Sequence, residues 1–383
     1  MLAAGGTAGH LFPAFALAQE LGRRGIGVDL VTDMRGDRYG AGFPARSIYQ
    51  VPAATFASRS PVLAARTLFT LGRGTLSAHG LMGRVRPAAV VGFGGYPTIP
   101  PLTAARLRGI PTILHEQNAV LGRANRLLSR GVSAIATSFA KVRLLDGALR
   151  EKARLTGNPV RDAVLQNAGR LYSASRDDDP FRLLVFGGSQ GARFFSDAVP
   201  PALVRLPDAL KQRLRVTQQC REEDLERVRD RYEQHGVKAE LATFFKDLPE
   251  RMAASHLVIG RAGASSVAEL AVLGVPSVLV PLPHALDNDQ LQNATQLAEA
   301  GACWAVEQKT LTESGLAELV ARLMSSAADL EKAAAAARGQ GRADAAVRLA
   351  DLVEELMGLR APSHVRDMQS ERAREPARLS GGH

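Results

Sequence analysis

The stretch Gly260–Leu270, with the sequence GRAGASSVAEL, combines residue types that can bind an anion. The apolar run 257–259 before it predicts a buried strand, and the residues from Ser265 onward predict a helix. Ser265 and Ser266 suit the N-cap, and the unpaired N–H groups and dipole of a helix N-terminus attract negative charge. The pattern is therefore typical of a turn that holds a phosphate or the diphosphate of a nucleotide.

Glu269 adds a second chemical cue, because a carboxylate beyond a phosphate turn can accept hydrogen bonds from ribose hydroxyls. The alternative is an ordinary strand–helix junction with a core-facing pair of serines and a solvated glutamate. The stretch by itself leaves both interpretations open.

A second glycine turn, GGTAGH at 5–10, follows the short apolar segment 1–4 and precedes a helix expected from Pro13 to Leu21. The turn differs from the G-x-G-x-x-G dinucleotide motif. His10 stands where the carboxyl ends of parallel strands place ligands, and an imidazole there can act as a general base near neutral pH. The alternative is a histidine that caps its own helix.

Two further strand ends carry residues typical of a binding cleft. The strand 88–91 runs into GFGGYP at 92–97, and the strand 112–114 ends at HEQN, residues 115–118. Four consecutive polar residues at one strand end indicate that they line a cleft. Asp287-x-Asp289 resembles a carboxylate pair for a metal, but this spacing is weak evidence, and we expect no metal site.

The elements that must position these residues alternate between strands and helices along the chain. The alternation restarts at 181–186, after a polar linker at 173–180, and the restart again ends in a glycine turn, GGSQGAR at 187–193. Two such repeats predict an α/β fold with two doubly wound, Rossmann-like domains that face each other across a cleft. The length of 383 residues fits two domains. We expect residues 312–358 to be helical throughout and residues 361–383 to be disordered.

Charge is distributed unevenly between the two halves. Residues 1–145 contain 17 Lys and Arg but 5 Asp and Glu, whereas the whole chain has a net charge of +10. This basic half predicts a phosphate-rich partner such as nucleic acid, an anionic membrane or a diphosphate substrate. Within it, 60–86 predicts a basic amphipathic helix, which either lies on an anionic membrane or packs on the sheet with its arginines in water.

Nucleic acid is the least favoured of these partners. Aromatic residues make up 5% of the chain, and the basic half contains no aromatic RNA-binding motif. The two cysteines, Cys220 and Cys303, are far apart, form no metal-binding pattern and fit a reducing cytoplasmic setting. We therefore expect no nucleic-acid partner.

Taken together, the motifs resemble the MurG family. These bacterial enzymes transfer N-acetylglucosamine from UDP to undecaprenyl-diphosphate-linked N-acetylmuramoyl-pentapeptide and so form the lipid-linked disaccharide of peptidoglycan. Ala8 departs from the commonest family pattern, which has glycine there. The resemblance covers residues 1 to about 358, and its motifs occur in the family order: GGTAGH, GFGGYP, HEQN, TGNPVR at 156–161, GGSQGAR, RAGASSVAEL and Gln290-x-x-Asn293-Ala294.

The resemblance implies a GT-B architecture with an N-terminal acceptor and membrane domain at 1–160 and a UDP-sugar domain at 161–342. A last helix at 343–360 would cross back to the first domain. The implied activity is that of an inverting hexosyltransferase without a cofactor, peripheral to the cytoplasmic face of the inner membrane. The implied partners are UDP-N-acetylglucosamine, the lipid-linked muramoyl-pentapeptide and an anionic membrane surface. The alternative is another GT-B transferase or a UDP-sugar epimerase with the same donor pocket.

Site residues follow from the same resemblance. His10 is the expected general base, and Glu116 is a second candidate. Glu269 would bind the ribose, Phe245 would contact the uracil through its backbone, and Gln290 would bind the sugar hydroxyls. The helix N-terminus and Arg161 would stabilise the leaving diphosphate without a metal. The full expected donor site comprises Thr7, Ala8, Gly9, Asn118, Arg161, Ser189, Phe245, Ala264, Ser265, Ser266, Val267, Ala268, Glu269 and Gln290.

Overall fold

The computed structural model describes residues 1–6, 8–33, 42–55, 61–176, 179–283 and 286–360, and it describes positions 8, 188–192 and 286 by their backbone alone. Thr7 and the expected disordered tail at 361–383 lie outside the described residues.

Seven parallel strands form the sheet of the N-terminal half, in the order β3-β2-β1-β4-β5-β6-β7. The order reverses between β1 and β4, and the GGTAGH and GFGGYP turns follow these two strands. A ligand crevice forms at such a switch point. The strands are β1 Leu2–Ala3, β2 Asp29–Thr32, β3 Ser47–Gln50, β4 Val90–Gly92, β5 Thr112–Glu116, β6 Ala134–Thr137 and β7 Ala153–Leu155; the helices are α1 Ala8–Arg23, α2 Pro61–Val85, α3 Ile99–Leu107, α4 Arg123–Ser129 and α5 Ala148–Glu151. The next helix along the chain, α6 Asp162–Asn167, packs against helices of the second unit.

Six parallel strands form the second sheet, in the order β10-β9-β8-β11-β12-β13. Its switch point lies between β8 and β11, which lead into the GGSQGAR and GRAGASS turns. The strands are β8 Phe181–Phe186, β9 Leu214–Gln219, β10 Lys238–Ala242, β11 Leu257–Gly260, β12 Ser277–Leu279 and β13 Cys303–Ala305; the helices are α7 Gly188–Val204, α8 Asp208–Arg213, α9 Leu225–Gln234, α10 Leu248–Ala254, α11 Ala264–Leu273, α12 Asp289–Glu299, α13 Glu313–Met324, α14 Ala327–Gln340 and α15 Ala345–Leu356.

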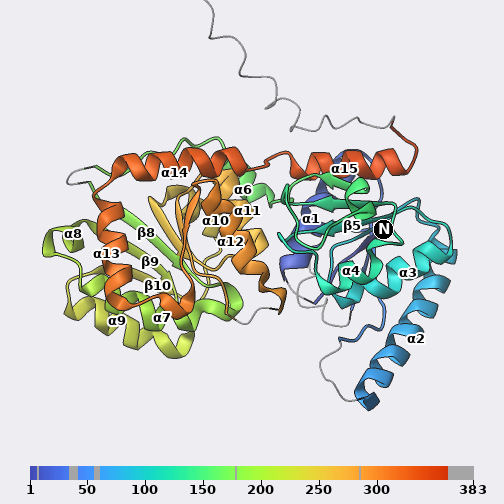
Figure 1. Cartoon of the computed structure of the whole chain (residues 1–383), viewed down its shortest axis with the longest axis horizontal. Coiled ribbons are helices and arrows are strands. Elements are labelled where there is room, and N and C mark those ends of the chain that lie inside the picture. Colours follow the sequence, from blue (N-terminus) through green and yellow to red (C-terminus); the bar gives the residue numbers. More distant parts are fainter. Residues whose placement is uncertain (7, 34–41, 56–60, 177–178, 284–285, 361–383) are drawn as a thin grey trace, which may run out of the picture.

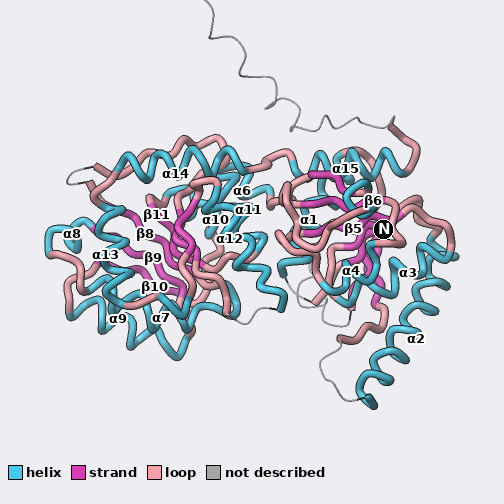
Figure 2. The backbone as a smooth tube through the Cα atoms, in the orientation of Figure 1, coloured by secondary structure: helices cyan, strands magenta, loops and turns pink. Residues whose placement is uncertain are grey.

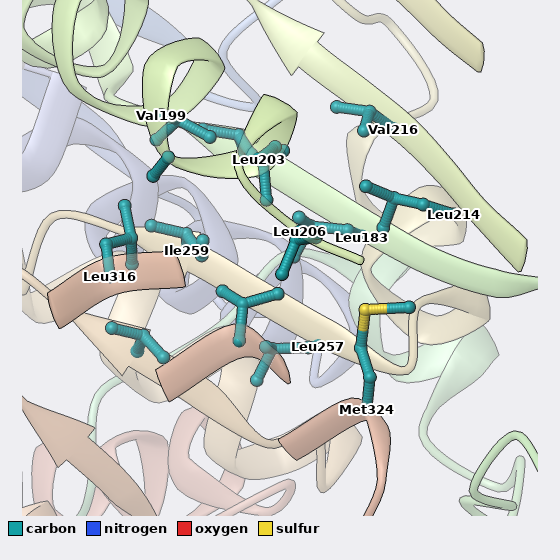
Figure 3. Packing of buried hydrophobic residues seen from close by; sticks show 14 of the residues in the cluster. Leu183, Val199, Leu203, Leu206, Leu214, Val216, Leu257, Ile259, Leu316 and Met324 are labelled. Carbon is teal, nitrogen blue, oxygen red and sulfur yellow. The ribbon is translucent and has the colours of Figure 1, made fainter. Parts of the chain in front are cut away.

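Each sheet has its own apolar core between two layers of helices (Figures 1 and 2). In the second sheet, Leu183 of β8 and Ile259 of β11 are buried against Leu203 of α7 and Leu316 of α13 (Figure 3). Strands covered on both faces consist of almost continuous apolar residues, which is why FRLLVF at 181–186 predicts one. The two expected Rossmann-like units are confirmed.

The C-terminal segment returns to the first sheet. Helix α14 packs on α11, whereas α15 packs on α1 (Figure 1). The expectation that residues 312–358 are helical throughout is wrong at two breaks, which fall after Met324 and after Gln340. At the second break, a Cβ on Gly341 would lie 2.5 Å from the carbonyl oxygen of Ala271, so the close approach of the linker to α11 requires glycine.

Helix α2 projects from the N-terminal half (Figure 1). One face packs on α3 and buries Leu71, Ala78 and Met82. The opposite face exposes large apolar side chains. Within the described chain, no helix is both long enough and apolar enough to cross a bilayer. The exposed apolar residues of α2 are Val62, Leu63, Leu68, Phe69 and Leu76.

Candidate functional site

The N-terminus of α11 forms the turn expected to bind a diphosphate. Gly260 ends β11, Gly263 is the N-cap in an extended conformation, and the helix begins at Ala264. The expectation that Ser265 and Ser266 form the cap is therefore wrong, because they lie in the first helical turn. The hydroxyl of Ser265 is buried and accepts or donates no hydrogen bond within the described chain. This hydroxyl and the N-terminal N–H groups can therefore bind an incoming anion.

Glu269 lies on the same helix, and its side chain is 5% exposed. Arg161 donates hydrogen bonds to both carboxylate oxygens, from Nε at 2.9 Å and from Nη2 at 3.0 Å. The guanidinium also stacks on the ring of Phe12 at 4.8 Å. Burial raises the pKa of Glu269, and the neighbouring arginine opposes that shift. The interpretation of Glu269 as a solvated carboxylate is thus wrong.

His10 lies in the first turn of α1 and faces the glycine turn after β4. A Cβ on Gly94 would lie 3.4 Å from its Cε1, and a Cβ on Gly95 would lie 3.3 Å from its Nε2. Burial lowers the pKa of His10, although the side chain of Gln117 and the carbonyl of Phe93 are close enough to oppose the shift. Its Nδ1 is buried and forms no hydrogen bond with any of the described residues. The imidazole is therefore neutral at neutral pH, as a general base requires.

His115 and Gln117 form a buried network behind His10. His115 Nε2 lies 3.0 Å from the carbonyl oxygen of Gly157, and Gln117 Nε2 lies 2.9 Å from both His115 Nδ1 and the carbonyl oxygen of Phe93. The amide donates to Nδ1, so Nε2 carries the proton of His115. Burial lowers the pKa of His115 to about 4. The expectation that this whole block lines a cleft is wrong for both side chains, which are buried.

Glu116 is also buried, and hydrogen bonds engage both of its carboxylate oxygens. The backbone N–H of Asn118 donates to Oε1 at 3.0 Å, and that of Gly122 donates to Oε2 at 2.8 Å. Asn125 Nδ2 on α4 also donates to Oε2, at 2.8 Å. Burial raises the pKa of Glu116. These contacts hold the loop that carries Asn118 against the start of α4.

Asn118 reaches across to the second half of the chain. Its Oδ1 accepts a hydrogen bond from Asn293 Nδ2 on α12 at 3.0 Å, and Asn293 Oδ1 accepts one from the backbone N–H of Ala119 at 2.8 Å. Gln290 lies one turn earlier on α12, where its Oε1 accepts a hydrogen bond from the backbone N–H of Leu282. The structure thus brings two expected site residues, Asn118 and Gln290, to one interdomain junction. Asn293 belongs to the Gln290-x-x-Asn293-Ala294 motif, but the sequence did not predict it as a site residue.

The other expected residues lie at the carboxyl edge of the sheets. Ala8 and Gly9 begin α1, and Ser189 lies in the first turn of α7. Phe245 follows β10 and packs under the guanidinium of Arg251 at 4.5 Å. Val267 is buried in α11.

A cavity of about 110 Å³ lies between the two halves of the chain. Ala264 and Ala268 line it from α11, and Asn158 and Arg342 line it from the two interdomain connections. His10 and Glu269 are not among its lining residues, so this cavity lies on the linker side of α11 rather than over the expected reacting groups. Within the described residues, no three His, Cys, Asp or Glu side chains gather as metal ligands.

Comparison with known proteins places these features in a family. The glycosyltransferase family 28 N-terminal domain matches residues 1–137, and the family 28 C-terminal domain matches residues 182–349. A relative from Rhodopseudomonas palustris (strain BisB18) is 54% identical over 94% of this chain and 96% of its own length. One from Rhizobium meliloti is 52% identical over 92% and 94%. Both are named UDP-N-acetylglucosamine–N-acetylmuramyl-(pentapeptide) pyrophosphoryl-undecaprenol N-acetylglucosamine transferase.

Solved structures agree with this assignment. The crystal structure of Acinetobacter baumannii MurG matches with a TM-score of 0.77 and 31% identity, over 93% of this chain and 98% of that chain. The UDP-GlcNAc 2-epimerase of Neisseria meningitidis matches with a TM-score of 0.64 at 15% identity, over 94% of this chain and 99% of that chain, which shows a shared fold. The expected GT-B architecture is confirmed, and the chain belongs to the MurG family of glycosyltransferases, within glycosyltransferase family 28.

Proposed function

We propose that this enzyme transfers N-acetylglucosamine from UDP-N-acetylglucosamine to undecaprenyl-diphosphate-linked N-acetylmuramoyl-pentapeptide. The observation that carries the proposal is the identity of 54% over 94% of the chain to a transferase of that name. The geometry supports it, because α1, which carries His10, contacts α11, which carries Glu269. This contact supports the proposal, because it brings the helix of the expected base next to the helix expected to bind the nucleotide.

The donor site is built around α11. The diphosphate binds the helix N-terminus at Ala264–Ala268, where the Ser265 hydroxyl is unpaired within the described chain. The ribose hydroxyls donate to Glu269, the backbone of Phe245 contacts the uracil, and the sugar hydroxyls bind Gln290. Thr7, Ala8, Gly9, Asn118, Arg161 and Ser189 complete the donor site.

The reaction is a direct displacement at the anomeric carbon. The acceptor 4-hydroxyl attacks this carbon, His10 takes the hydroxyl proton, the bond to the diphosphate oxygen breaks, and the configuration inverts. Charge that develops on the leaving diphosphate is stabilised by the N-terminus of α11 and by Arg161. Glu116 is the weaker candidate for the base because three donors already engage its oxygens. Its role is to position Asn118 and α4.

Residues 1–160 form the acceptor domain, 161–342 form the donor domain, and 343–360 return to the first. The two separate sheets support this division. Arg24, directly after α1, forms ion pairs with Asp351 and Glu354 on α15, both at 2.8 Å, and these support the return of the last helix.

The enzyme binds peripherally to the cytoplasmic face of the inner membrane through α2. Its apolar side chains stand largely in water, with Val62 77% and Leu76 75% exposed. Arg66 and Arg73 lie on the same helix and are exposed. An apolar face with flanking cations suits an anionic bilayer surface, where both the apolar burial and the charge contribute.

Vesicle co-sedimentation tests the membrane proposal. The double variant Leu68→Ser, Phe69→Ser is compared with Leu171→Ser, which removes an 81% exposed leucine far from α2 in the sequence. We expect the parent and the control to bind anionic vesicles and the double variant to lose most binding. Equal binding by all three proteins would exclude α2 as the contact.

A transfer assay tests the reaction. Labelled UDP-N-acetylglucosamine is incubated with a soluble lipid-diphosphate muramoyl-pentapeptide analogue, and the products are separated. We expect the disaccharide and UDP in equal amounts. Interconversion of the UDP-sugar without any disaccharide would instead identify an epimerase.

A further inference from the structure

We propose that Arg123 and Arg126 form a second diphosphate site, for the diphosphate of the acceptor, and that Asp287 occupies this site until the acceptor displaces it. Asp287 would then act as a latch between the two domains. The proposal rests on the proposed function for the identity of the acceptor, but its binding test does not.

The latch consists of three arginines from the N-terminal half and one residue from the C-terminal half. Arg123 Nε and Arg126 Nη2 on α4 lie 3.3 Å and 3.1 Å from the same carboxylate oxygen of Asp287. Arg143 Nη2 donates a hydrogen bond to the backbone carbonyl oxygen of Asp287 at 2.8 Å. Two arginines therefore share one carboxylate oxygen while a third binds the backbone of the same residue, and positive charge exceeds negative charge among these four residues.

The arginines of α4 retain capacity for another ligand. Their side chains are 48% and 37% exposed, and each directs one nitrogen to Asp287. A guanidinium has five N–H donors in a planar fork that matches phosphate oxygens. A diphosphate carries more charge than one carboxylate and can accept from both forks at once. It therefore competes favourably with Asp287 for this pair.

The position of α4 explains why the acceptor would arrive there. Ala124 of α4 packs with Leu71 of α2 and Ile99 of α3 in one small apolar cluster. Figure 1 shows α4 beside α3, with α2 extending from the same end of the domain. Leu127, also on α4, is 66% exposed. A lipid held in a bilayer at α2 would thus bring its diphosphate close to the arginines of α4.

Asp287 is connected to the donor site through the backbone. It lies in the short turn η4, Leu286–Asn288, directly before α12, which carries Gln290. Asp287 and Asn288 have φ values of 68° and 53°, a left-handed conformation that Asp and Asn adopt more readily than other side chains but less readily than glycine. Contacts to the arginines help to hold this turn. When a diphosphate takes those arginines, the turn is released, and acceptor binding is communicated to the sugar-binding helix.

Isothermal titration with inorganic pyrophosphate tests the site, with saturating UDP present so that the donor site is filled. Asp287→Asn removes the competing charge, and we expect it to tighten pyrophosphate binding about three- to fivefold, the effect of one exposed ion pair. The triple variant Asp287→Asn, Arg123→Gln, Arg126→Gln should bind pyrophosphate at least about tenfold more weakly than Asp287→Asn alone, because charge-assisted hydrogen bonds are lost. Arg130→Gln, at the end of the same helix, is the matched control and should change nothing.

The triple variant decides between a ligand site and a purely structural ion pair. If the arginines serve Asp287 alone, their removal in the Asp287→Asn background will leave pyrophosphate binding unchanged, and the proposal is overturned. Thermal unfolding of each variant verifies that it is folded. In the transfer assay, the same arginine changes should raise KM for the lipid-linked acceptor while leaving KM for the donor near the parent value. Pyrophosphate binding that depends on the arginines, without transfer to this acceptor, would retain the site and reject the proposed reaction.

Discussion

Replacing Glu269 by glutamine isolates the contribution of its charge to donor binding. Glutamine keeps the size of the side chain and one oxygen acceptor, so the packing of this buried position in α11 is preserved. In the free enzyme Arg161 occupies both carboxylate oxygens at 2.9 and 3.0 Å. The ribose hydroxyls must therefore share the carboxylate with Arg161 or replace one of its two hydrogen bonds.

The expected loss follows from the strength of charged hydrogen bonds. A hydrogen bond to a charged group contributes about 1.5–3 kcal/mol, against about 0.5–1.5 kcal/mol for a neutral pair. One weakened ribose contact therefore costs about 1–1.5 kcal/mol, or about tenfold in Kd for UDP, and two contacts cost up to about a hundredfold.

Calorimetric titration with UDP and with 2′,3′-dideoxy-UDP measures this loss. Glu269→Gln should weaken UDP about ten- to a hundredfold and should leave the dideoxy ligand nearly unchanged, because that ligand has no hydroxyl to donate. Glu354→Gln, which removes a carboxylate paired with Arg24 outside the site, serves as the control for lost ion pairing. An equal loss for both ligands would refute ribose recognition by Glu269 and indicate that the change acts by freeing Arg161.

Three further predictions concern the buried network and the linker. The pKa of His115 is about 4 in the folded protein and near 6.5 in the unfolded chain, so the unfolded chain is protonated first as the pH falls. The free energy of unfolding should therefore decrease by up to about 3 kcal/mol between pH 6.5 and 4. Denaturant unfolding should show a smaller decrease for His115→Gln. Gln117→Leu should lower kcat about tenfold or more with an unchanged Kd for UDP, because it removes the amide that contacts His115 and Phe93 behind the expected base. Isothermal titration measures the Kd for UDP, and initial rates measure kcat. Gly341→Ala should destabilise the protein by about 1–3 kcal/mol, because its Cβ would meet the Ala271 carbonyl at 2.5 Å; thermal unfolding measures the loss.

Each of these predictions has an opposing result. A pH–stability curve that is identical in His115→Gln and the parent would show that another group titrates. A loss of UDP binding in Gln117→Leu would place this side chain in the donor site. Unchanged unfolding of Gly341→Ala would show that the linker can move away from α11 at no cost.

Local patterns predicted the strands and helices because both sheets are parallel and buried. An apolar run such as 181–186 is recognisable without knowledge of its neighbours. Helix ends were less predictable. Pro13 suggested the start of α1, but the helix begins at Ala8 and contains this proline in its interior. Packing against the sheet here outweighs the hydrogen bond that proline cannot donate.

The contacts that assemble the site could not be predicted from spacing. Arg161 and Glu269 are 108 residues apart, and Asn118 and Asn293 are 175 residues apart. Neither pair leaves a periodic signal. Arg161 meets Glu269 because the start of α6 packs against α11, and Asn118 meets Asn293 because the two halves of the chain approach each other. Glu116 shows the same limitation, since its residue type suggested a base, whereas its partners on Asn118, Gly122 and Asn125 are visible in the folded loop alone.

The most direct test of the account is a single-turnover measurement that separates chemistry from donor binding in His10→Ala. Labelled UDP-N-acetylglucosamine is mixed with the acceptor analogue and an excess of enzyme, at an enzyme concentration well above the Kd for the donor, and the Kd for UDP is measured in parallel. We expect His10→Ala to slow transfer about 10²- to 10⁴-fold, the usual contribution of a general base, with Kd for UDP within about twofold of the parent. In the parent, the acid limb of the rate profile should lie below pH 6.5, because burial lowers the pKa of His10. Transfer by His10→Ala at the parental rate would contradict the central claim that His10 removes the acceptor proton.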